Sequence, residues 1–158
     1  MRHPAPHWSP WHRAAGLTLI ELLVVIVVLG LLAAIALPSY QQSLYKSRRS
    51  DAMRALATMQ QAQERWRGNN ALYQSDLSSL SGATASTSPS GYYDLAIVAD
   101  SVSASGYTLR ASASAGGQQA GDASCQVFEV QLAAGTVTYR SYAAGGTPNG
   151  SPDPCWVK

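Results

Sequence analysis

The side chains that most often carry out catalysis are nearly absent from most of this chain. All three histidines lie near the N-terminus, at His3, His7 and His12. The remaining residues therefore lack the imidazole that Ser-His-Asp and Cys-His mechanisms require. Two cysteines without a histidine are also too few for a zinc site, and the aspartates are dispersed along the chain. We expect no enzymatic activity, no cofactor and no metal site.

Glu21 stands out among the acidic residues because it lies inside an apolar run. Within residues 17–37, only Thr18 and Glu21 are conspicuously polar. As a helix rising about 1.5 Å per residue, this run would span roughly 32 Å, close to the thickness of the hydrocarbon core of a bilayer. The run is apolar on all sides, whereas a helix of a soluble core is apolar on one face. We expect it to lie in a membrane or in a helical bundle of equal length. A carboxylate there costs a few kcal/mol unless it is neutralised or paired.

The charges outside this run are few and nearly balanced. The 158 residues are 46% hydrophobic and 13% charged, and the formal net charge is +2. Arg2 and Arg13 precede the run without an accompanying acid, which favours a cytoplasmic N-terminus. Without these two arginines, basic and acidic residues are equal in number, which argues against a nucleic-acid binder.

A secretory signal peptide is the competing interpretation of the apolar run. Its cleavage site would lie in the small residues 33–36. The run is long for such a signal, however, and an ordinary signal has no reason to retain an acid at Glu21.

The motif Gly16-Leu17-Thr18-Leu19-Ile20-Glu21, followed by the apolar run and by Pro38-Ser39-Tyr40, resembles the N-terminal signature of type IV prepilins. The resemblance implies that a prepilin peptidase cleaves between Gly16 and Leu17 on the cytoplasmic side and methylates the new N-terminus of Leu17. It also implies the fold of this family, which is a long helix packed on a four-stranded sheet.

The resemblance divides the chain into three segments. Residues 1–16 would be the leader, residues 17–38 the transmembrane and filament-core helix, and residues 39–158 the globular domain. Cleavage would give Leu17 a positive amine, and the amine of a neighbouring subunit would pair with Glu21 and enforce the register between subunits. The alternative is a carboxylate that simply reaches the membrane headgroups.

A second helical segment is predicted over residues 39–67. Pro38 lacks the N–H that a helix interior requires, so we expect a kink or local unwinding there. Beyond it, apolar side chains recur on one face, and residues 68–70 supply a stop signal. The basic stretch 46–49 would contact headgroups, acids of a neighbouring subunit or solvent. The predicted apolar face consists of Ala52, Ala55, Leu56, Met59, Ala62 and Trp66.

The remainder of the chain predicts a small antiparallel sheet. Residues 70–91 are expected to form a connection with one short turn of helix around residues 76–80. Alternating apolar and polar residues predict four strands after it, and Ala133-Ala134-Gly135 indicates a hairpin between the last two. The expected fold class is therefore α+β, with the long helix packed on this sheet. The strands are expected at residues 93–98, 107–113, 126–132 and 136–142.

Cys125 and Cys155 follow the pattern of the same family, in which a disulfide holds the C-terminal loop against the sheet. With the N-terminus inside, both cysteines would lie on the oxidising side of the membrane. Closing a loop of about 30 residues stabilises the folded chain by roughly 3–4 kcal/mol in the chain-entropy model. The ending Cys155-Trp156 is similar to that of minor pilins of the PilE type.

The resemblance implies a structural minor pilin that is anchored in the bacterial inner membrane as a single pass and is then assembled into an extracellular pilus for twitching motility or adhesion. Its expected partners are other pilin subunits, prepilin peptidase, the pilus assembly machinery of the inner membrane and, before assembly, the membrane itself. The alternatives are a type II secretion pseudopilin, a membrane-anchored enzyme, or a pilin-like module that binds DNA or surfaces. A stripe through Arg110 and Arg140 would serve DNA binding, although the neutral charge argues against this partner.

Overall fold

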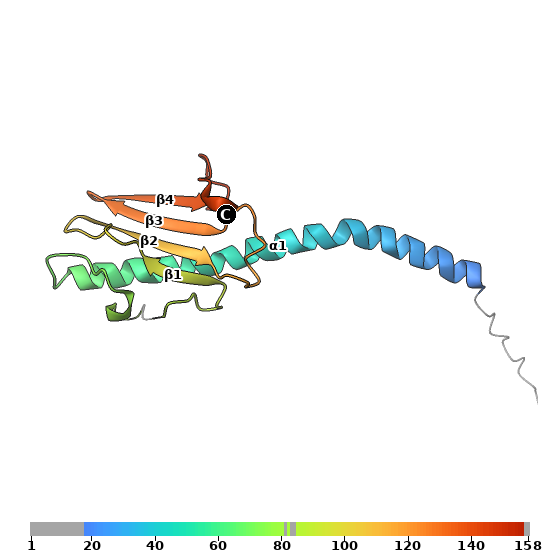
Figure 1. The fold of residues 1–158 in the computed structure, drawn as a ribbon, viewed down its shortest axis with the longest axis horizontal. Coiled ribbons are helices and arrows are strands. Elements are labelled where there is room, and N and C mark those ends of the chain that lie inside the picture. Colours follow the sequence, from blue (N-terminus) through green and yellow to red (C-terminus); the bar gives the residue numbers. More distant parts are fainter. Residues whose placement is uncertain (1–17, 81, 83–84, 157–158) are drawn as a thin grey trace, which may run out of the picture. The chain divides into compact units, whose positions relative to one another are not determined.

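The computed structural model describes residues 18–80, 82 and 85–156 (Figure 1). These residues form one long helix, α1 (Leu19–Arg67), and four strands, β1 (Tyr93–Ile97), β2 (Gly106–Ala113), β3 (Val127–Ala133) and β4 (Thr136–Tyr142). Two compact units divide the chain, residues 1–39 and residues 40–158, so that α1 contributes to both. The predicted α+β class, with a long helix packed on an antiparallel sheet, is confirmed.

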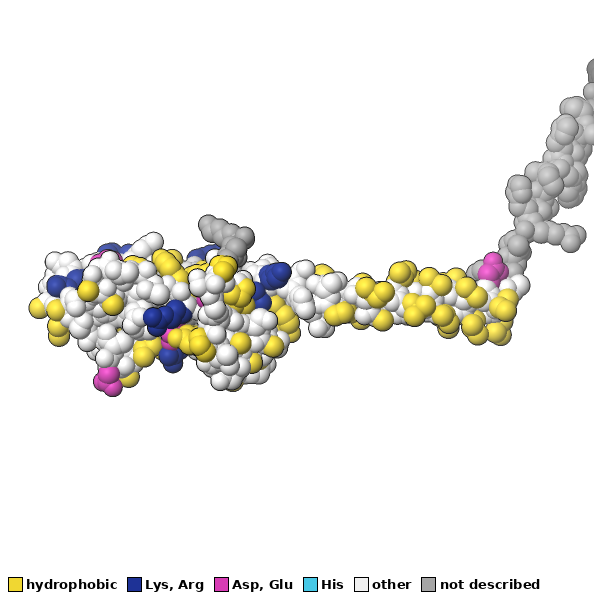
Figure 2. Space-filling view, turned by 90° about the horizontal axis from the view of Figure 1, so that it is seen from above, with side chains coloured by type: hydrophobic (Ala, Val, Ile, Leu, Met, Phe, Trp, Pro, Cys, Tyr) yellow, Lys and Arg dark blue, Asp and Glu magenta, His cyan; other side chains and the backbone are white. Residues whose placement is uncertain are grey.

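The first unit contains the apolar part of α1. Its large side chains from Leu19 to Leu37 are exposed, and they form the continuous yellow surface in Figure 2. Among the described residues, α1 is the one helix that is long and apolar enough to cross a membrane, as judged by length and composition. Apolar residues on every side of a helix need a partner other than water.

Pro38 lies inside α1, which remains helical on both sides of it. Because proline lacks an N–H, the helix loses one backbone hydrogen bond at this point. The Ser39 hydroxyl donates to the carbonyl oxygen of Ala36 at 2.9 Å. The structure contains no interruption of the helix here, and the kink at Pro38 stays a prediction.

The second part of α1 carries the predicted apolar face. Ala52, Ala55, Leu56, Met59 and Ala62 are buried as expected, but Trp66 is only half-buried. The helix ends where predicted, because Gly68 N–H donates to Glu64 O and the Asn70 side-chain amide donates to Trp66 O. This face packs against the sheet and forms the core of the second unit.

The sheet has the strand order β1-β2-β3-β4, and all neighbours are antiparallel. The strand limits lie within about one residue of those predicted, and the turn between β3 and β4 is the predicted hairpin. At its tip Ala134 and Gly135 both have positive φ, 47° and 80°, the pattern of a two-residue turn whose twist matches the flanking strands.

The inner face of the sheet consists of large apolar and aromatic residues. Phe128 makes edge-on contacts with Tyr93 and Trp156, with ring centroids 5.7 Å and 5.4 Å apart. Aromatic pairs in this geometry add to the free energy gained by burying their area. The fully buried members of this core include Leu56, Met59, Leu80, Tyr93, Tyr107, Leu109, Phe128 and Val130.

The connection between α1 and β1 contains the short turn predicted from the sequence. A 3₁₀ helix covers Leu77–Ser79, and the Asp76 carboxylate caps it by accepting from the Ser78 N–H at 3.0 Å. Residues 86–88 then run along the outer edge of β1, where Ser88 N–H donates to Tyr93 O and Leu95 N–H donates to Ser86 O. This edge of the sheet is therefore covered. A second short 3₁₀ helix, Ala144–Gly146, follows β4.

Candidate functional site

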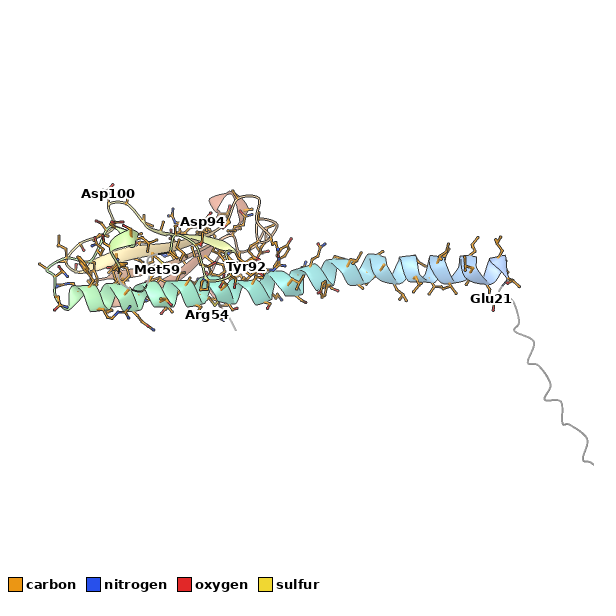
Figure 3. The ribbon with its side chains drawn as sticks, turned by 90° about the horizontal axis from the view of Figure 1, so that it is seen from below. Glu21, Arg54, Met59, Tyr92, Asp94 and Asp100 are labelled. Atoms are coloured by element: carbon orange, nitrogen blue, oxygen red, sulfur yellow. A yellow bond between two sulfur atoms is a disulfide. The ribbon has the colours of Figure 1, made fainter. Side chains whose placement is uncertain are left out.

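The N-terminal end of α1 carries Glu21 (Figure 3), whose hydrogen-bond partner is Thr18. The Glu21 carboxylate accepts from the Thr18 N–H at 3.3 Å, and the Thr18 hydroxyl accepts from the Glu21 N–H at 3.3 Å. This reciprocal pair is a capping box, which satisfies two helix N–H groups at once. The spacing Thr-x-x-Glu is the sequence signal for it, and the sequence analysis missed it. Glu21 is thus held at the helix start by its own chain, with its side chain exposed.

The predicted cleavage and methylation residues, Gly16 and Leu17, lie outside the described residues. The leader 1–16 also lies outside them. The position of Glu21 relative to a mature N-terminus therefore stays a prediction.

An ion pair between α1 and the loop before β3 corrects one expectation. Arg49 donates from Nε and Nη2 to the two oxygens of Asp122, at 2.7 Å and 2.9 Å. The two side chains are only 12% and 3% exposed. Arg48 in turn donates to Gln118 O at 3.1 Å and lies over the ring of Tyr92. The interpretation of these two arginines as groups free for headgroups, neighbours or solvent is therefore wrong, because both bind within their own domain.

Asp122 also organises the chain around the first cysteine. Its carboxylate accepts from the Gln119 amide at 3.0 Å and from the backbone N–H groups of Ser124 and Cys125 at 3.3 Å and 3.2 Å. A buried carboxylate needs several donors to offset its loss of hydration. Through Asp122, the helix α1 therefore holds the loop that carries Cys125.

A disulfide joins Cys125 and Cys155, the pair that the resemblance implied. The Asn149 side-chain amide donates to Ser124 O, to the Ser141 hydroxyl and to Cys155 Sγ. The Trp156 indole N–H donates to Arg140 O at 2.8 Å. These bonds fasten the C-terminal loop along the end of β4.

The outer face of the sheet carries a row of charged residues across three strands. Glu129 on β3 is paired in register with Arg110 on β2 and with Arg140 on β4. Its carboxylate accepts from Arg110 Nε at 2.6 Å and from the Tyr142 hydroxyl at 2.7 Å. The hydrogen bond to Glu129 raises the pKa of Tyr142, and burial adds to the effect, since loss of the proton would place two anions side by side.

Glu129 changes the interpretation of the predicted arginine stripe. Only 5% of its surface is exposed, and it neutralises Arg110 directly. The stripe through Arg110 and Arg140 therefore contains an acid between its two bases. The place of Glu129 between the two arginines depends on the cross-strand register, which is not visible in the sequence.

Glu64 on α1 faces two tyrosines at the other end of the domain. The hydroxyls of Tyr107 and Tyr73 donate to it at 3.4 Å and 3.3 Å. Burial raises the pKa of Tyr107, and the Glu64 charge raises it further. Tyr107 remains a neutral hydrogen-bond donor at physiological pH, which suits a structural role.

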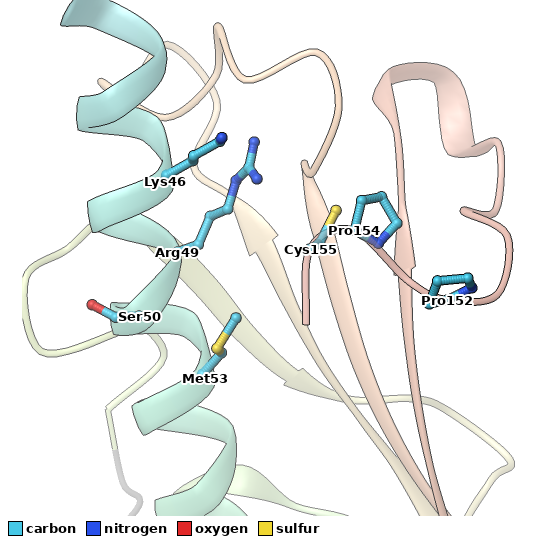
Figure 4. Close-up of a pocket in the computed structure, with 7 residues that line it drawn as sticks. All are labelled: Lys46, Arg49, Ser50, Met53, Pro152, Pro154 and Cys155. Carbon is cyan, nitrogen blue, oxygen red and sulfur yellow. The ribbon is translucent and has the colours of Figure 1, made fainter. Parts of the chain in front are cut away.

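A cavity of about 630 Å³ in the second unit lies between α1 and the C-terminal loop (Figure 4). Its polar side comes from Lys46, Arg49 and Ser50 on α1, and its apolar side from Met53, Pro152 and Pro154. Arg49 is already engaged by Asp122. Within the part of the chain that the structure describes, no group of three or more His, Cys, Asp or Glu residues could hold a metal ion.

These features define a chain with an apolar N-terminal helix and a disulfide-closed α+β domain. A family model described as "Type IV minor pilin ComP, DNA uptake sequence receptor" matches residues 38–129, more than half of the chain. A second model, the "Prokaryotic N-terminal methylation motif", matches residues 11–37. The chain therefore belongs to the type IV pilin family.

Several curated pilins are similar to this chain. The "Type IV major pilin protein PilE" of Neisseria gonorrhoeae is 36% identical over 78 residues, which cover 49% of this chain and 46% of that protein. The "Fimbrial protein EcpC" of Eikenella corrodens is 57% identical over 37 residues, 23% of this chain and 24% of that protein. The "Type IV major fimbrial protein FimA" of Dichelobacter nodosus is 45% identical over 49 residues, 31% of each. The chain thus spans less than half the length of each of these relatives.

Proposed function

We propose that this protein is a minor subunit of a type IV pilus, held in the inner membrane by its apolar helix before it enters the filament. The observation that carries the proposal is the methylation motif at residues 11–37, which overlaps the apolar part of α1 that begins at Leu19. The description of the matching family model, a minor pilin, supports the minor role. The similarity to fimbrial proteins favours a pilin over a type II secretion pseudopilin.

Maturation would proceed as the resemblance implies. Prepilin peptidase would remove residues 1–16 and methylate Leu17, which leaves residues 17–38 as the membrane and filament-core helix and residues 39–158 as the globular domain. With the N-terminus cytoplasmic, both cysteines would form their bond outside the cytoplasm. The partners would be other pilin subunits and the assembly machinery of the inner membrane.

Glu21 would have two successive partners in this proposal. In the separate subunit, Thr18 satisfies part of its hydrogen-bonding capacity. In the filament, the methylated amine of a neighbouring Leu17 would supply a positive charge, which the neutral hydroxyl of Thr18 cannot. An intramembrane acid gains more from a charged partner than from a hydroxyl.

The intact mass of the protein tests this maturation directly. In cells with prepilin peptidase, we expect a chain that begins at Leu17 and carries one methyl group. Reduction under denaturing conditions should add two hydrogens, because Cys125 and Cys155 are joined and buried. In cells without the peptidase, the leader should remain attached. Cleavage after Ala36, or a mass that does not depend on the peptidase, would reject the proposal.

DNA binding is a second candidate function, and one observation favours it. The model that matches residues 38–129 is described as a DNA uptake sequence receptor. Arg140, exposed on the outer face of the sheet, is the most suitable phosphate contact there, since Arg110 is neutralised by Glu129. Each phosphate contact contributes to affinity through the release of counterions.

Fluorescence anisotropy with a labelled random-sequence duplex tests this second function at several salt concentrations. If Arg140 contacts a phosphate, the Arg140→Gln variant should bind more weakly and lower the salt slope by about one unit. Arg54→Gln serves as the control, because Arg54 is equally charged and exposed but lies on α1. Equal losses in the two variants, or no binding by the unaltered protein, would reject the sheet as the DNA-binding surface.

A further inference from the structure

Asn149 ties the C-terminal loop to the rest of the domain through the nitrogen of its side chain. Nδ2 donates to Ser124 O at 3.0 Å, to Ser141 Oγ at 2.8 Å and to Cys155 Sγ at 3.2 Å. The backbone N–H of Asn149 donates to Ser141 O at 2.9 Å. One residue therefore joins the loop before β3, the end of β4 and the second cysteine.

The three partners of Nδ2 all accept hydrogen bonds and have no proton to give in return. A backbone carbonyl and a disulfide sulfur carry no hydrogen. The Ser141 hydroxyl carries one, but donates it to the Asp153 carboxylate, whose oxygens lie 2.7 Å and 2.9 Å away. Ser141 is fully buried. The site therefore suits a neutral amide, which donates, and not a carboxylate, which only accepts.

Asn149 is also the only asparagine of the sequence that is followed by glycine. In such a pair the backbone nitrogen of the glycine attacks the side-chain carbon Cγ, and no Cβ hinders its approach. A C–N bond forms and closes a succinimide ring. The Cγ–Nδ2 bond breaks, and ammonia leaves with the proton of the attacking N–H. Water then opens the ring to aspartate or isoaspartate.

We propose that Asn149 is a deamidation site that the disulfide-closed loop keeps unreactive, and that its conversion prevents the loop from closing again. In the closed loop, three acceptors hold Nδ2, the atom that must leave. The side chain has to part from them before Gly150 N reaches Cγ. Local opening of the loop therefore sets the rate of deamidation. The bond between Cys125 and Cys155 suppresses this opening.

The product does not fit the place of the amide. The aspartate that forms at position 149 would direct its carboxylate at Ser124 O. It would also lie across the Ser141 hydroxyl from Asp153, so that two anions compete for one proton donor. A buried anion without donors is unfavourable. Isoaspartate adds a methylene group to the backbone and shifts Cys155 relative to β4. A chain that deamidates before its disulfide forms therefore loses the native loop permanently.

Peptide mapping by mass spectrometry measures the rate of deamidation in the full chain in micelles at mildly alkaline pH. Conversion at Asn149 should be at least about tenfold faster in the double variant Cys125→Ser, Cys155→Ser than in the unaltered oxidised chain. Adding Gly150→Ala to the double variant should slow it again. The new Cβ meets no atom within 4 Å, so the fold tolerates it, but it hinders the attack.

Asn70 is the internal reference for general unfolding, because its amide donates to Trp66 O at the end of α1. Its rate of deamidation should be the same in the oxidised chain and in the double variant. Equal rates at Asn149 in these two chains would overturn the proposal. An equal acceleration at Asn70 and Asn149 would also count against it, since the protection would then belong to the whole domain and not to the loop.

The variant Asn149→Asp tests the effect of the product while the disulfide is intact. Thr147→Asp is the matched control, because it adds the same charge to an exposed side chain of the same loop. Cys125 and Cys155 are only 1% and 2% exposed, so a neutral phosphine reduces their bond only when the loop opens. Reduction, followed by maleimide labelling of the thiols, should be about tenfold faster in Asn149→Asp than in Thr147→Asp. If the two variants are reduced at the same rate, the amide does not hold the loop and the proposal is wrong.

Discussion

Replacing Arg49 with methionine is expected to lower the free energy of unfolding of the globular domain by about 3–5 kcal/mol, the usual cost of leaving one member of a buried ion pair without its partner. Asp122, whose side chain is only 3% exposed, would lose two charged donors. The loop that carries Cys125 would be weakened as well. Urea denaturation of the full chain in micelles, followed by near-UV circular dichroism, measures the change.

Arg54→Met is the matched control, because Arg54 lies on the same helix with its side chain exposed. Its effect should stay within about 0.5 kcal/mol. A double variant, Arg49→Met with Asp122→Asn, should recover part of the loss, since the uncompensated charge is removed. If Arg49→Met costs no more than Arg54→Met, the ion pair does not hold the loop on the helix.

The second large effect is expected at Glu21. If the carboxylate pairs with the amine of a neighbouring subunit, Glu21→Gln should lower the amount of this subunit in sheared filaments more than tenfold. Breaking a buried pair costs about 3–5 kcal/mol, and each 1.4 kcal/mol corresponds to about a factor of ten. Glutamine can still cap the helix, so the loss would reflect the missing charge. The subunit is quantified by immunoblot in the filament and membrane fractions.

Thr18→Val separates capping from assembly. This variant removes the hydroxyl that binds Glu21 but retains the carboxylate, so its cost should be limited to that of a helix cap, about 0.5–2 kcal/mol. Cleavage by prepilin peptidase should proceed in both variants. Normal incorporation of Glu21→Gln would show that the charge of this residue is not needed in the filament.

The elements of the fold were predictable because each depends on local sequence. The long apolar run and the recurrence of Leu56 and Met59 on one helix face each indicate a helix. The alternation of apolar and polar residues over 128–132 indicates a strand. The hairpin at Ala134-Gly135 follows from the residues that tolerate positive φ.

Polar residues in the interior were not predictable in the same way. Gln63 is fully buried, yet its amide donates to Gln74 O and accepts from Gln74 N–H. Asp122 and Glu129 are likewise buried with partners that lie 73 and 19 positions away in the chain. Glutamine, aspartate and glutamate are usually exposed in folded proteins. They are buried only where the fold supplies their hydrogen bonds, and the sequence does not show where that is.

The sequence by itself determined the class of this protein. The Gly-Leu-Thr-Leu-Ile-Glu motif, the apolar run that follows it and the two cysteines on either side of the last two strands are all local features. Only the tertiary structure decided which charges are free. Arg49 and Arg110 are neutralised by distant acids, and Glu21 is bound by Thr18. It also decided which edge of the sheet is open, because the backbone groups of β1 and β4 are equivalent until residues 86–88 cover one of them. Pairing over such separations depends on the register and packing of the whole domain, which the spacing of residues along the chain does not encode.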